Sequence, residues 1–450
     1  PAPPHPPSLT IPPPPISTPW LGRGQRLLCL RDRLTLRAFD ICRRFDVETR
    51  ESLLGTVDEL MHADGVVHEN EQRFRDELFA LLEEPIELDD LEIEPLSDGA
   101  VVIGDPRSLA PRELDHPFLQ PFERHYAADP AIFARQAQAD VDLIQRFSAK
   151  LEEQRAAGKG RLAEAKDFTG FAGSEPFLDG HVCVFPPKPE VDYELLVLGD
   201  LHGCYSCLKA ALLQQDFFGK AQAYHDDPAG NPYPLVVFLG DYIDRGRFSY
   251  NGILRTVMQL YLRVPEHVVV LRGNHEYYVE YQGQVLAPVQ PSEAMTSLRS
   301  VAPVEVFAAY MKLFEALPSM LVFDRTLFVH AGIPRDDTLA EKCTGLPSLN
   351  DDEIRFQMLW SDPSEADYIP LDLQKANARF PFGKLQFKRF MAQIGCTTMI
   401  RGHEKIIEGV RTIFDGPEGT LISLFSAGGA SNDDLPAGSN YRVVTPTALT

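Results

Sequence analysis

Short apolar runs that stop at a glycine and a potential metal ligand are the feature that most limits the fold of this chain. Three runs end in this way, and stretches with helical spacing follow the first two: Leu195–Leu198 before Gly199-Asp200, Leu235–Leu239 before Gly240-Asp241 and Val268–Leu271 before Gly273-Asn274, with helices predicted over Leu208–Leu213 and Ile253–Leu262. Alternating strands and helices favour βαβ units and a largely parallel central sheet. Ligands bind beyond the carboxyl ends of such strands, where these three motifs fall.

Five motifs in the second half of the chain offer Asp, Asn or His side chains, and apolar runs precede four of them. In order, they are Gly199-Asp200-Leu201-His202-Gly203, Gly240-Asp241-Tyr242-Ile243-Asp244-Arg245-Gly246, Gly273-Asn274-His275-Glu276, His330-Ala331-Gly332 and Arg401-Gly402-His403. Oxygen and nitrogen donors of these kinds suit a pair of divalent metal ions. A metal pair held in this way is typical of phosphate-ester hydrolysis, so the residues alone predict a reaction class.

The order and spelling of the five motifs resemble the metallophosphoesterase superfamily and, more narrowly, the eukaryotic-type serine/threonine phosphoprotein phosphatases, over about residues 194–445. The resemblance implies an α/β fold, a calcineurin-like β-sandwich flanked by helices. It also implies two divalent metal ions, with manganese expected and iron or zinc as alternatives. By motif match, the first ion is held by Asp200 and His202, both ions are bridged by Asp241, and the second is held by Asn274, His330 and His403.

The same resemblance implies the catalytic and substrate-binding residues. A hydroxide that bridges the two ions attacks phosphorus directly, His275 protonates the leaving alkoxide, and Asp244 pairs with His275. An imidazolium is a suitable proton donor near neutral pH, and a carboxylate partner is expected to raise its pKa. Arg245 is expected to clamp phosphoryl oxygens through its planar fork, with Arg379 as a second phosphate-binding residue. Two alternatives stay open: His275 as a further metal ligand, and Arg379 as a plain surface arginine.

Parts of the catalytic region depart from the family pattern. The family has Ser-Ala-Pro-Asn-Tyr-Cys near its C-terminus, whereas Gly428 and Gly429 follow Ser426-Ala427 here, so we expect a flexible loop without an aromatic wall. The segment between Tyr277 and Glu305 is a long insert, expected to cover part of the groove as a lid. The stretch that ends in Asp362-Pro363 resembles a family segment and is expected to shape the rim, with no chemistry assigned to Asp362.

The first part of the chain is predicted to be separate from the catalytic domain, which we place at residues 191–450. Residues 1–24 are a Pro-rich tail that favours polyproline II, either as a linker or as a ligand for an SH3-like groove. Residues 25–95 are predicted to form a small helical domain, within which 47–85 weakly resembles tellurite-resistance-type helical domains. Residues 96–190 are predicted to be an acidic, partly helical linker region, with one helix from Asp129-Pro130 to Gly158.

Composition argues against several classes of partner. The net charge of −22 argues against a nucleic-acid partner and against docking on an anionic membrane. Seven scattered cysteines indicate a reduced, cytoplasmic compartment. Cys204 and Cys207 begin a predicted helix, so they are either a redox pair with a lowered thiol pKa or two ordinary packed cysteines.

The motifs thus predict a metal-dependent phosphoprotein phosphatase that hydrolyses phosphoserine and phosphothreonine monoesters in a phosphoprotein or phosphopeptide. A dinucleoside polyphosphate hydrolase is the alternative enzyme, although those enzymes often end the third motif in Asp, where this chain has Glu276. A hypothesis from another class is a phosphatase-fold scaffold or regulatory protein, whose N-terminal helical region would recruit a protein partner.

Overall fold

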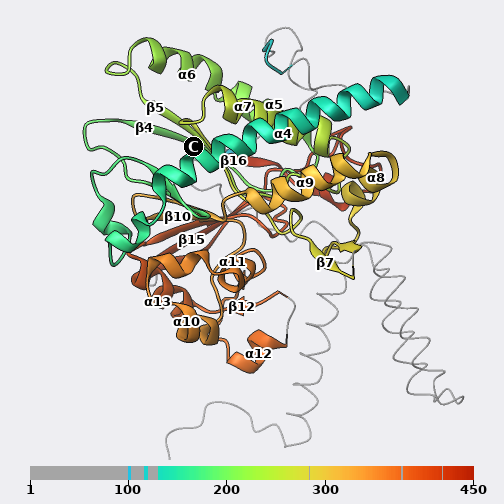
Figure 1. Ribbon diagram of the computed structural model, residues 1–450. Helices are drawn as coiled ribbons and strands as arrows, with labels where there is room; N and C mark the ends of the chain where they lie inside the picture. Colours follow the sequence, from blue (N-terminus) through green and yellow to red (C-terminus); the bar gives the residue numbers. More distant parts are fainter. Residues whose placement is uncertain (1–99, 103–115, 120–129, 283, 377–378, 418) are drawn as a thin grey trace, which may run out of the picture. The chain divides into compact units, whose positions relative to one another are not determined.

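Two β-sheets packed face to face form the centre of the fold, and helices cover their outer faces (Figure 1). The computed structural model describes residues 100–102, 116–119, 130–282, 284–376, 379–417 and 419–450. The predicted Pro-rich tail, small helical domain and tellurite-resistance-type segment lie outside the described residues. The predicted α/β class and the β-sandwich flanked by helices are confirmed for the described part of the chain.

The first sheet has five strands and carries the first three sequence motifs. Its strand order is β1 (Ala100–Val102), β16 (Thr447–Leu449), β4 (Tyr193–Leu198), β5 (Tyr233–Phe238) and β6 (Val268–Val270). The strands β4, β5 and β6 are parallel, as the alternating pattern predicts, and β16 pairs antiparallel with both β4 and β1. The sheet therefore joins its central βαβ units to a strand from the end of the chain.

The second sheet has seven strands and carries the last two motifs. Its order is β14 (Val410–Gly416), β15 (Gly419–Leu424), β13 (Thr398–Arg401), β10 (Thr326–Val329), β9 (Met320–Phe323), β3 (Val182–Phe185) and β2 (Phe177–Asp179). Two short pairs lie outside the sandwich: β7 (Val279–Tyr281) with β8 (Gln284–Leu286), and β11 (Asp362–Pro363) with β12 (Pro381–Phe382).

The helices divide between the two outer faces. On the five-stranded side lie α4 (Pro130–Gly158), α5 (Tyr205–Gln214), α6 (Phe217–Asp226), α7 (Arg255–Arg263), α8 (Glu293–Val301) and α9 (Val304–Ala316). The second half contains α10 (Asp336–Lys342), α11 (Asp352–Met358), α12 (Leu371–Lys375) and α13 (Lys384–Ile394), of which α11 and α13 pack on the seven-stranded sheet. The short turns are η3 (Arg161–Glu164), η4 (Phe168–Phe171), η5 (Ser249–Leu254), η6 (Leu346–Asn350) and η7 (Asn440–Val443).

Strand β5 shows why its sequence is apolar throughout. Leu235 and Val237 point between the two sheets, whereas Val236 and Phe238 point toward the helices. Successive side chains of a strand alternate between its faces, so a strand that is covered on both faces needs an uninterrupted apolar run. The continuous runs in the sequence therefore mark strands buried on both sides.

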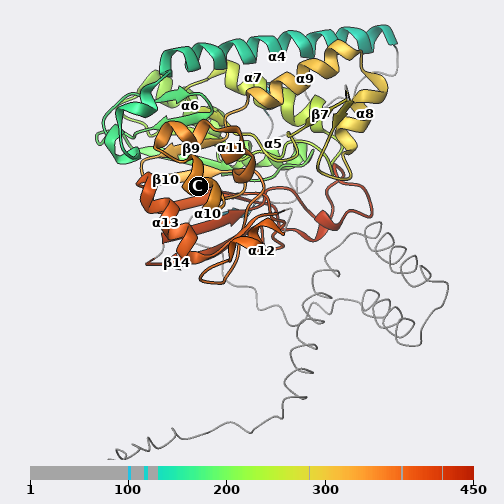
Figure 2. The same cartoon turned by 60° about the horizontal axis from the view of Figure 1, so that its bottom comes forward.

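Helix α4 is the predicted helix from Pro130 to Gly158, and the structure confirms it. It contacts α7, α9 and β2, and Figure 2 shows it lying along the outside of the molecule beside α7 and α9. Its end lies so close to β2 that a Cβ atom on Gly158 would collide with the carbonyl of Leu178. Glycine is needed there because the two backbones touch.

The predicted boundary near residue 190 falls inside a compact unit that spans residues 93–450. The segment that we expected to be a linker supplies β2 and β3 to the seven-stranded sheet and packs α4 against α7 and α9. The division of the chain into domains therefore stays a prediction, and the strands before residue 190 belong to the catalytic sandwich. Across the described residues, no helix combines the length and apolar character that crossing a lipid bilayer requires.

Candidate metal centre

Five strands deliver the predicted ligands to one place. Asp200 and His202 follow β4, Asp241 follows β5, and Asn274 follows β6, while His330 and His403 follow β10 and β13 of the other sheet. Backbone hydrogen bonds hold these loops together within each sheet: His202 N–H donates to Asp241 O at 2.9 Å, and Gly402 N–H donates to His330 O at 2.9 Å. The sandwich thus brings all six predicted ligands together, although they are distant in sequence.

Asp241 is the carboxylate common to two clusters of ligand atoms. One cluster contains His202, Asp241 and His275, and the other contains Asp241, His330 and His403; within each cluster the ligand atoms lie within 4.8 Å of one another. Asp200 adjoins the first cluster, because its Oδ2 lies 3.6 Å from His202 Nε2. A shared carboxylate between two ligand groups is the arrangement that two neighbouring cations require.

Two histidines have their ring orientation fixed by backbone carbonyls. His202 Nδ1 lies 3.0 Å from Ile243 O, and His330 Nδ1 lies 3.0 Å from Leu239 O. A ring that donates its Nδ1–H to a carbonyl presents the lone pair of Nε2 on its other side, as metal-bound histidines do. Burial lowers the pKa of His330 to about 4, so its ring is neutral and available as a ligand at neutral pH.

The acidic groups of the site also fit cations. Asp200 Oδ2 is buried and has no hydrogen-bond partner among the described residues. Burial, together with the charges of Asp200 and Glu276, raises the pKa of Asp241 well above its ordinary value. Several buried carboxylates this close together repel one another unless positive charge neutralises them. The donor set therefore fits divalent cations held by the predicted residues.

Asn274 lies between the two histidines of the second cluster. In the orientation that satisfies its neighbours, the side-chain amide nitrogen of Asn274 lies 2.8 Å from His330 Nε2 and 3.0 Å from His403 Nδ1. His403 Nε2 lies 3.1 Å from Arg379 Nε, so the ring contacts Asn274 through Nδ1 and Arg379 through Nε2.

His275 and Asp244 form the predicted pair. His275 Nδ1 lies 2.7 Å from Asp244 Oδ2, and Asp244 Oδ1 accepts the backbone N–H of Ala294 at 2.7 Å. The expected rise in the pKa of His275 is outweighed. Burial first, and then the electrostatic influence of His202 and Arg245, hold the pKa of His275 well below its ordinary value. Asp244 therefore orients the ring, whose Nε2 lies 3.7 Å from Asp241 Oδ2.

The two predicted phosphate-binding arginines both lie at the site. Arg245 Nη1 donates to both carboxylate oxygens of Glu293 at 3.0 Å and to Pro291 O at 2.8 Å. Arg379 Nε lies 2.9 Å from Asp362 Oδ2, and its Nη2 donates to His403 O at 3.0 Å. Arg379 is thus in contact with a predicted metal ligand. Asp362, to which we assigned no chemistry, forms this ion pair with Arg379 and also accepts a hydrogen bond from the buried Arg401 at 2.8 Å.

Three residues contact the site in ways that the sequence did not predict. The ring of Tyr441, from η7, lies 5.3 Å from the ring of His202 and stacks on Phe425. Glu276 accepts the backbone N–H groups of Asp241, Tyr242 and Gly273 and so ties two ligand loops together. Glu293 comes from α8, in the insert that we expected to act as a lid.

Tyr441 corrects the expectation that the site lacks an aromatic wall. The family pairs Ser-Ala with a nearby Asn-Tyr, and this chain has Asn440-Tyr441 only after twelve intervening residues, 428 to 439. Burial raises the pKa of Tyr441 to about 12, and Arg245 is one of its hydrogen-bonding neighbours. The Asn-Tyr pair itself was the signal in the sequence, but it lies well beyond the place where the motif puts it.

The ligand loops have strained backbones. His202, Asp241, Asp244, Arg245 and His403 all adopt positive φ angles, between 42° and 73°. Non-glycine residues seldom take this conformation, and each one costs of order 1–3 kcal/mol unless the surroundings impose it. Gly273 adds a further constraint, because a Cβ there would collide with Asp241. Such a concentration of strain is typical of functional sites.

Cys204 and Cys207 lie fully buried beneath this site, and both are free thiols. Burial, with Cys207 as the next contributor, raises the pKa of Cys204 well above its ordinary value. The alternative that the helix start lowers this thiol pKa is therefore wrong for Cys204. The two thiols fit the reading of ordinary packed cysteines.

Comparison with known proteins agrees with this geometry. Residues 193–406 match the family described as calcineurin-like phosphoesterase. A probable serine/threonine-protein phosphatase of Encephalitozoon cuniculi is 26% identical over 259 residues, which cover 57% of this chain and 51% of that protein. The serine/threonine-protein phosphatase 4 catalytic subunit of Saccharomyces cerevisiae is 25% identical over 248 residues, which cover 53% of this chain and 70% of that protein.

Among solved structures, the chain aligns with a protein serine/threonine phosphatase from Saccharomyces cerevisiae that is described as similar to human phosphatase PP5. The TM-score is 0.43 and the sequence identity is 18%. The alignment covers 70% of this chain and 89% of that one. The family match spans the part of the chain that carries all five motifs. The aligned part covers about half the length of the relative from Encephalitozoon cuniculi. Residues 193–406 thus match the calcineurin-like phosphoesterases, and the chain is similar to serine/threonine protein phosphatases over a catalytic region of that kind.

Proposed function

We propose that this protein is a serine/threonine phosphoprotein phosphatase that works with two divalent metal ions, manganese in the first place and iron or zinc as alternatives. The observation that supports this most directly is Asp241, which belongs to both ligand clusters. In the proposed site Asp200, His202 and Asp241 hold one ion, and Asp241, Asn274, His330 and His403 hold the other. Bound there, the ions would neutralise phosphoryl charge and lower the pKa of a bound water.

The proposed role of His275 is to protonate the leaving alkoxide. Its Nδ1 contact with Asp244 fixes the ring, and because burial favours the neutral ring in the free protein, Nε2 takes up a proton from solvent as the negatively charged phosphate group binds beside it. As the bond between phosphorus and the serine oxygen breaks, that proton passes from Nε2 to the leaving alkoxide. General acid–base assistance of this kind is worth about 10²–10⁴ in rate.

Arg245 and Arg379 would bind the phosphoryl oxygens, one from each side of the centre. In the structure each guanidinium is already engaged by a carboxylate, Arg245 by Glu293 and Arg379 by Asp362. A phosphate group must therefore share or replace these contacts. The pairs with Glu293 and Asp362 keep both arginines beside the site before the substrate arrives.

The test is hydrolysis by the full chain loaded with manganese. We expect release of phosphate from phosphoserine and phosphothreonine peptides, loss of this activity with Asp241→Asn, and about two ions per chain by metal analysis. Faster turnover of diadenosine tetraphosphate than of any phosphopeptide would favour the alternative hydrolase. Full metal occupancy without hydrolysis of p-nitrophenyl phosphate would instead favour the scaffold, and either result would overturn the proposal.

A further inference from the structure

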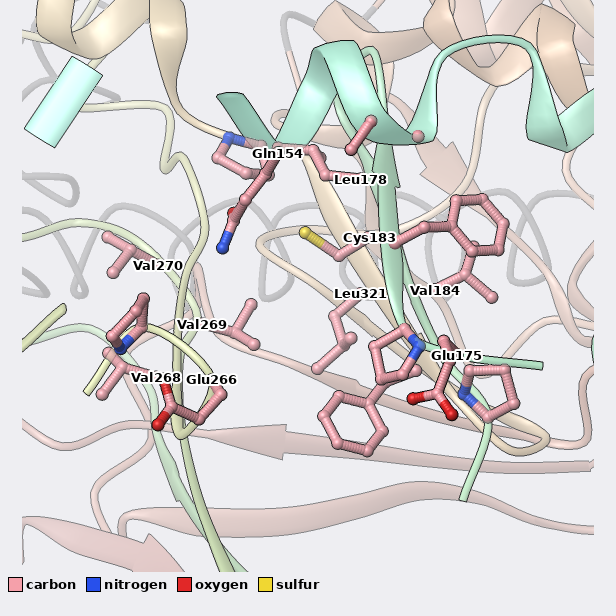
Figure 3. Close-up of a pocket in the computed structure, with 18 of the residues that line it drawn as sticks. Gln154, Glu175, Leu178, Cys183, Val184, Glu266, Val268, Val269, Val270 and Leu321 are labelled. Carbon is pink, nitrogen blue, oxygen red and sulfur yellow. The ribbon is translucent and has the colours of Figure 1, made fainter. Parts of the chain in front are cut away.

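A cavity of about 520 Å³ lies between the two sheets, at a side of the sandwich where the sheet edges diverge (Figure 3). Its walls come from β6 of the first sheet, from β2 and β3 of the second, and from the end of α4. The lining includes Leu178, Val184, Val269 and Leu321 and the rings of several tyrosines. This volume and this apolar lining are those of small-molecule binding sites.

The cavity is remote from the candidate metal centre. Tyr193 and Tyr233, the first residues of β4 and β5, line it, whereas the metal-ligand loops follow the last residues of the same strands. At about 3.3 Å per residue, the length of β4 separates the two places by roughly 20 Å. A ligand in the cavity would therefore bind separately from the substrate of the proposed reaction.

The edge of β6 offers open peptide groups to this cavity. Three consecutive residues, Val268 to Val270, line it, which requires the cavity to run along the strand edge, since successive side chains point to opposite faces. Val236 N–H donates to His267 O, and Leu271 N–H donates to Phe238 O, so the odd-numbered residues of β6 bond to β5. The peptide groups of Val268 and Val270 therefore face away from β5.

Those peptide groups have no hydrogen-bond partner within the part of the chain that the structure describes. The next even-numbered residue, Arg272, has a backbone hydrogen-bond partner, because its N–H donates to Pro318 O at 2.8 Å. Pro318 also lines the cavity. The cavity thus begins where the pairing of this strand edge stops, and a buried peptide group without a partner favours a ligand that supplies one.

A side-chain amide adds a further donor. Gln154 projects from α4 into the cavity, toward the gap between Val269 and Cys183 (Figure 3). Its Oε1 accepts a hydrogen bond from the hydroxyl of Tyr261 at 2.6 Å, and its Nε2 has no acceptor among the described residues. Cys183 Sγ also points into the cavity and is a free thiol. The side-chain amide, this thiol and the open peptide groups thus lie between the two sheets, in addition to the tyrosines and charged residues of the lining.

The charges around the cavity cancel. Arg161 and Lys188 oppose Glu175 and Glu266. Lys188 Nζ lies 2.9 Å from Glu175 Oε1, and the Arg161 guanidinium lies over the Phe177 ring at 4.0 Å while donating to Glu175 O. An ionised ligand would lose hydration in the apolar interior without gaining an opposite charge, which is unfavourable. The lining thus selects against carboxylates and amines.

From this geometry we propose that the cavity is a binding site for a small, neutral, apolar molecule that carries an amide group. Its hydrocarbon part fills the space between the sheets. Its carbonyl accepts from Gln154 Nε2 or from the N–H of Val270, and its N–H donates to an open carbonyl of β6. Neither the proposed phosphatase reaction nor its metal ligands take part in this site.

The test uses N-phenyl-1-naphthylamine, a neutral apolar dye that fluoresces when it leaves water, with the full-length protein. We expect the dye to bind and N-butylhexanamide to displace it, whereas decanoate does not. Cys183→Phe, which fills the cavity, should weaken dye binding about tenfold or more. The matched control is Cys343→Phe, which places the same ring at another half-buried cysteine, beside a different cavity; it should leave dye binding unchanged.

Amide hydrogen exchange of the unmodified protein provides a second measurement, which does not depend on the folding of any variant. Saturating N-butylhexanamide should slow exchange at Val268 and Val270 severalfold and leave Val269, which bonds to β5, unchanged. Dye displacement by decanoate alone, or no protection at Val268 and Val270, would overturn the proposal. Stronger protection by an extended apolar tripeptide would assign the site to a protein segment and overturn the small-molecule class.

Discussion

Asp241 has the most demanding position of any residue in this site. It is buried, its backbone lies in the left-handed region, and its carboxylate is shared between two ligand clusters. Glu276 and Gly273 secure it, one by accepting its N–H and the other by leaving room for its side chain. Substitutions around Asp241 are therefore expected to act through its position as much as through direct chemistry.

His275→Asn should reduce turnover by about 10²–10⁴ because Nε2 is lost as the proton donor to the leaving alkoxide, while the proposed metal ligands remain. Turnover of a phosphoserine peptide and metal content should be measured on the same preparation. Loss of one ion from this variant would show that His275 is a ligand, the alternative that the first cluster leaves open. Phenyl phosphate, whose phenolate leaves more easily, should be affected less than the peptide.

Arg379→Gln should tighten manganese binding and weaken phosphate binding. The arginine donates a hydrogen bond to Nε2 of His403, a predicted metal ligand, and places a positive charge beside it that disfavours a bound cation. Removing one such hydrogen bond, worth about 1 kcal/mol, predicts a roughly fivefold lower dissociation constant for manganese. Calorimetric titration with manganese and inhibition by inorganic phosphate would measure the two effects. Lys375→Gln, which removes the ion pair of another exposed cation, is the control. Weaker manganese binding by Arg379→Gln would contradict this account.

Among the elements, α8 was the least expected participant. The insert that contains it was predicted to be a lid, but its first turn is attached to the catalytic loop at two points. Glu293 accepts a hydrogen bond from Arg245, and the Ala294 N–H donates one to Asp244. A mobile lid could not orient Asp244, so this end of the insert is better described as a support for the His275 pair.

Ala294→Pro tests that support. Proline is tolerated in the first turn of a helix, so the substitution removes one N–H donor and leaves α8 otherwise compatible. We expect a fall in turnover of about tenfold, from the loss of one hydrogen bond to a charged carboxylate, with little change in the Michaelis constant. Ala294→Ser, which keeps the N–H, should behave as the unmodified protein. Equal losses in both variants would mean that the helix itself has moved.

The elements that the sequence predicted well are those whose signal is local. The strands β4, β5 and β6 and the helix α4 needed only apolar runs and helical spacing, and motif spelling selected six residues that the fold brings to one place. Their role as metal ligands stays a prediction. The contribution of β2 and β3, the position of Tyr441 and the lowered pKa of His275 depend on contacts between distant segments. Neither spacing nor composition contains that information, because packing of the two sheets creates it.

At the scale of the whole molecule, acid should destabilise the fold through His181, which lies between β2 and β3. Burial, together with the charge of Arg355, lowers its pKa from 6.5 to about 4. The unfolded chain therefore binds a proton below about pH 6.5 that the folded chain refuses until about pH 4, so stability falls as the pH falls through this window. The loss attributable to His181 is about 2 kcal/mol between about pH 7 and pH 5.

Urea unfolding of the unmodified protein and of His181→Gln, both with a chelator present, would measure this effect. The chelator makes protonation of the metal ligands common to both proteins, so their difference isolates His181. The variant should lose less stability than the unmodified protein over the same pH interval. Parallel losses in the two proteins would mean that His181 titrates normally in the folded state.

The position of β16 has a consequence for synthesis in the cell. This strand lies between β1 and β4, and β4 leads directly into Asp200. A nascent chain on the ribosome lacks this neighbour of β4 until residues 447–449 have been added. The metal-binding loops can therefore reach their final arrangement only after residue 449 has been added, and a polypeptide truncated before that residue would have an open sheet and no competent centre.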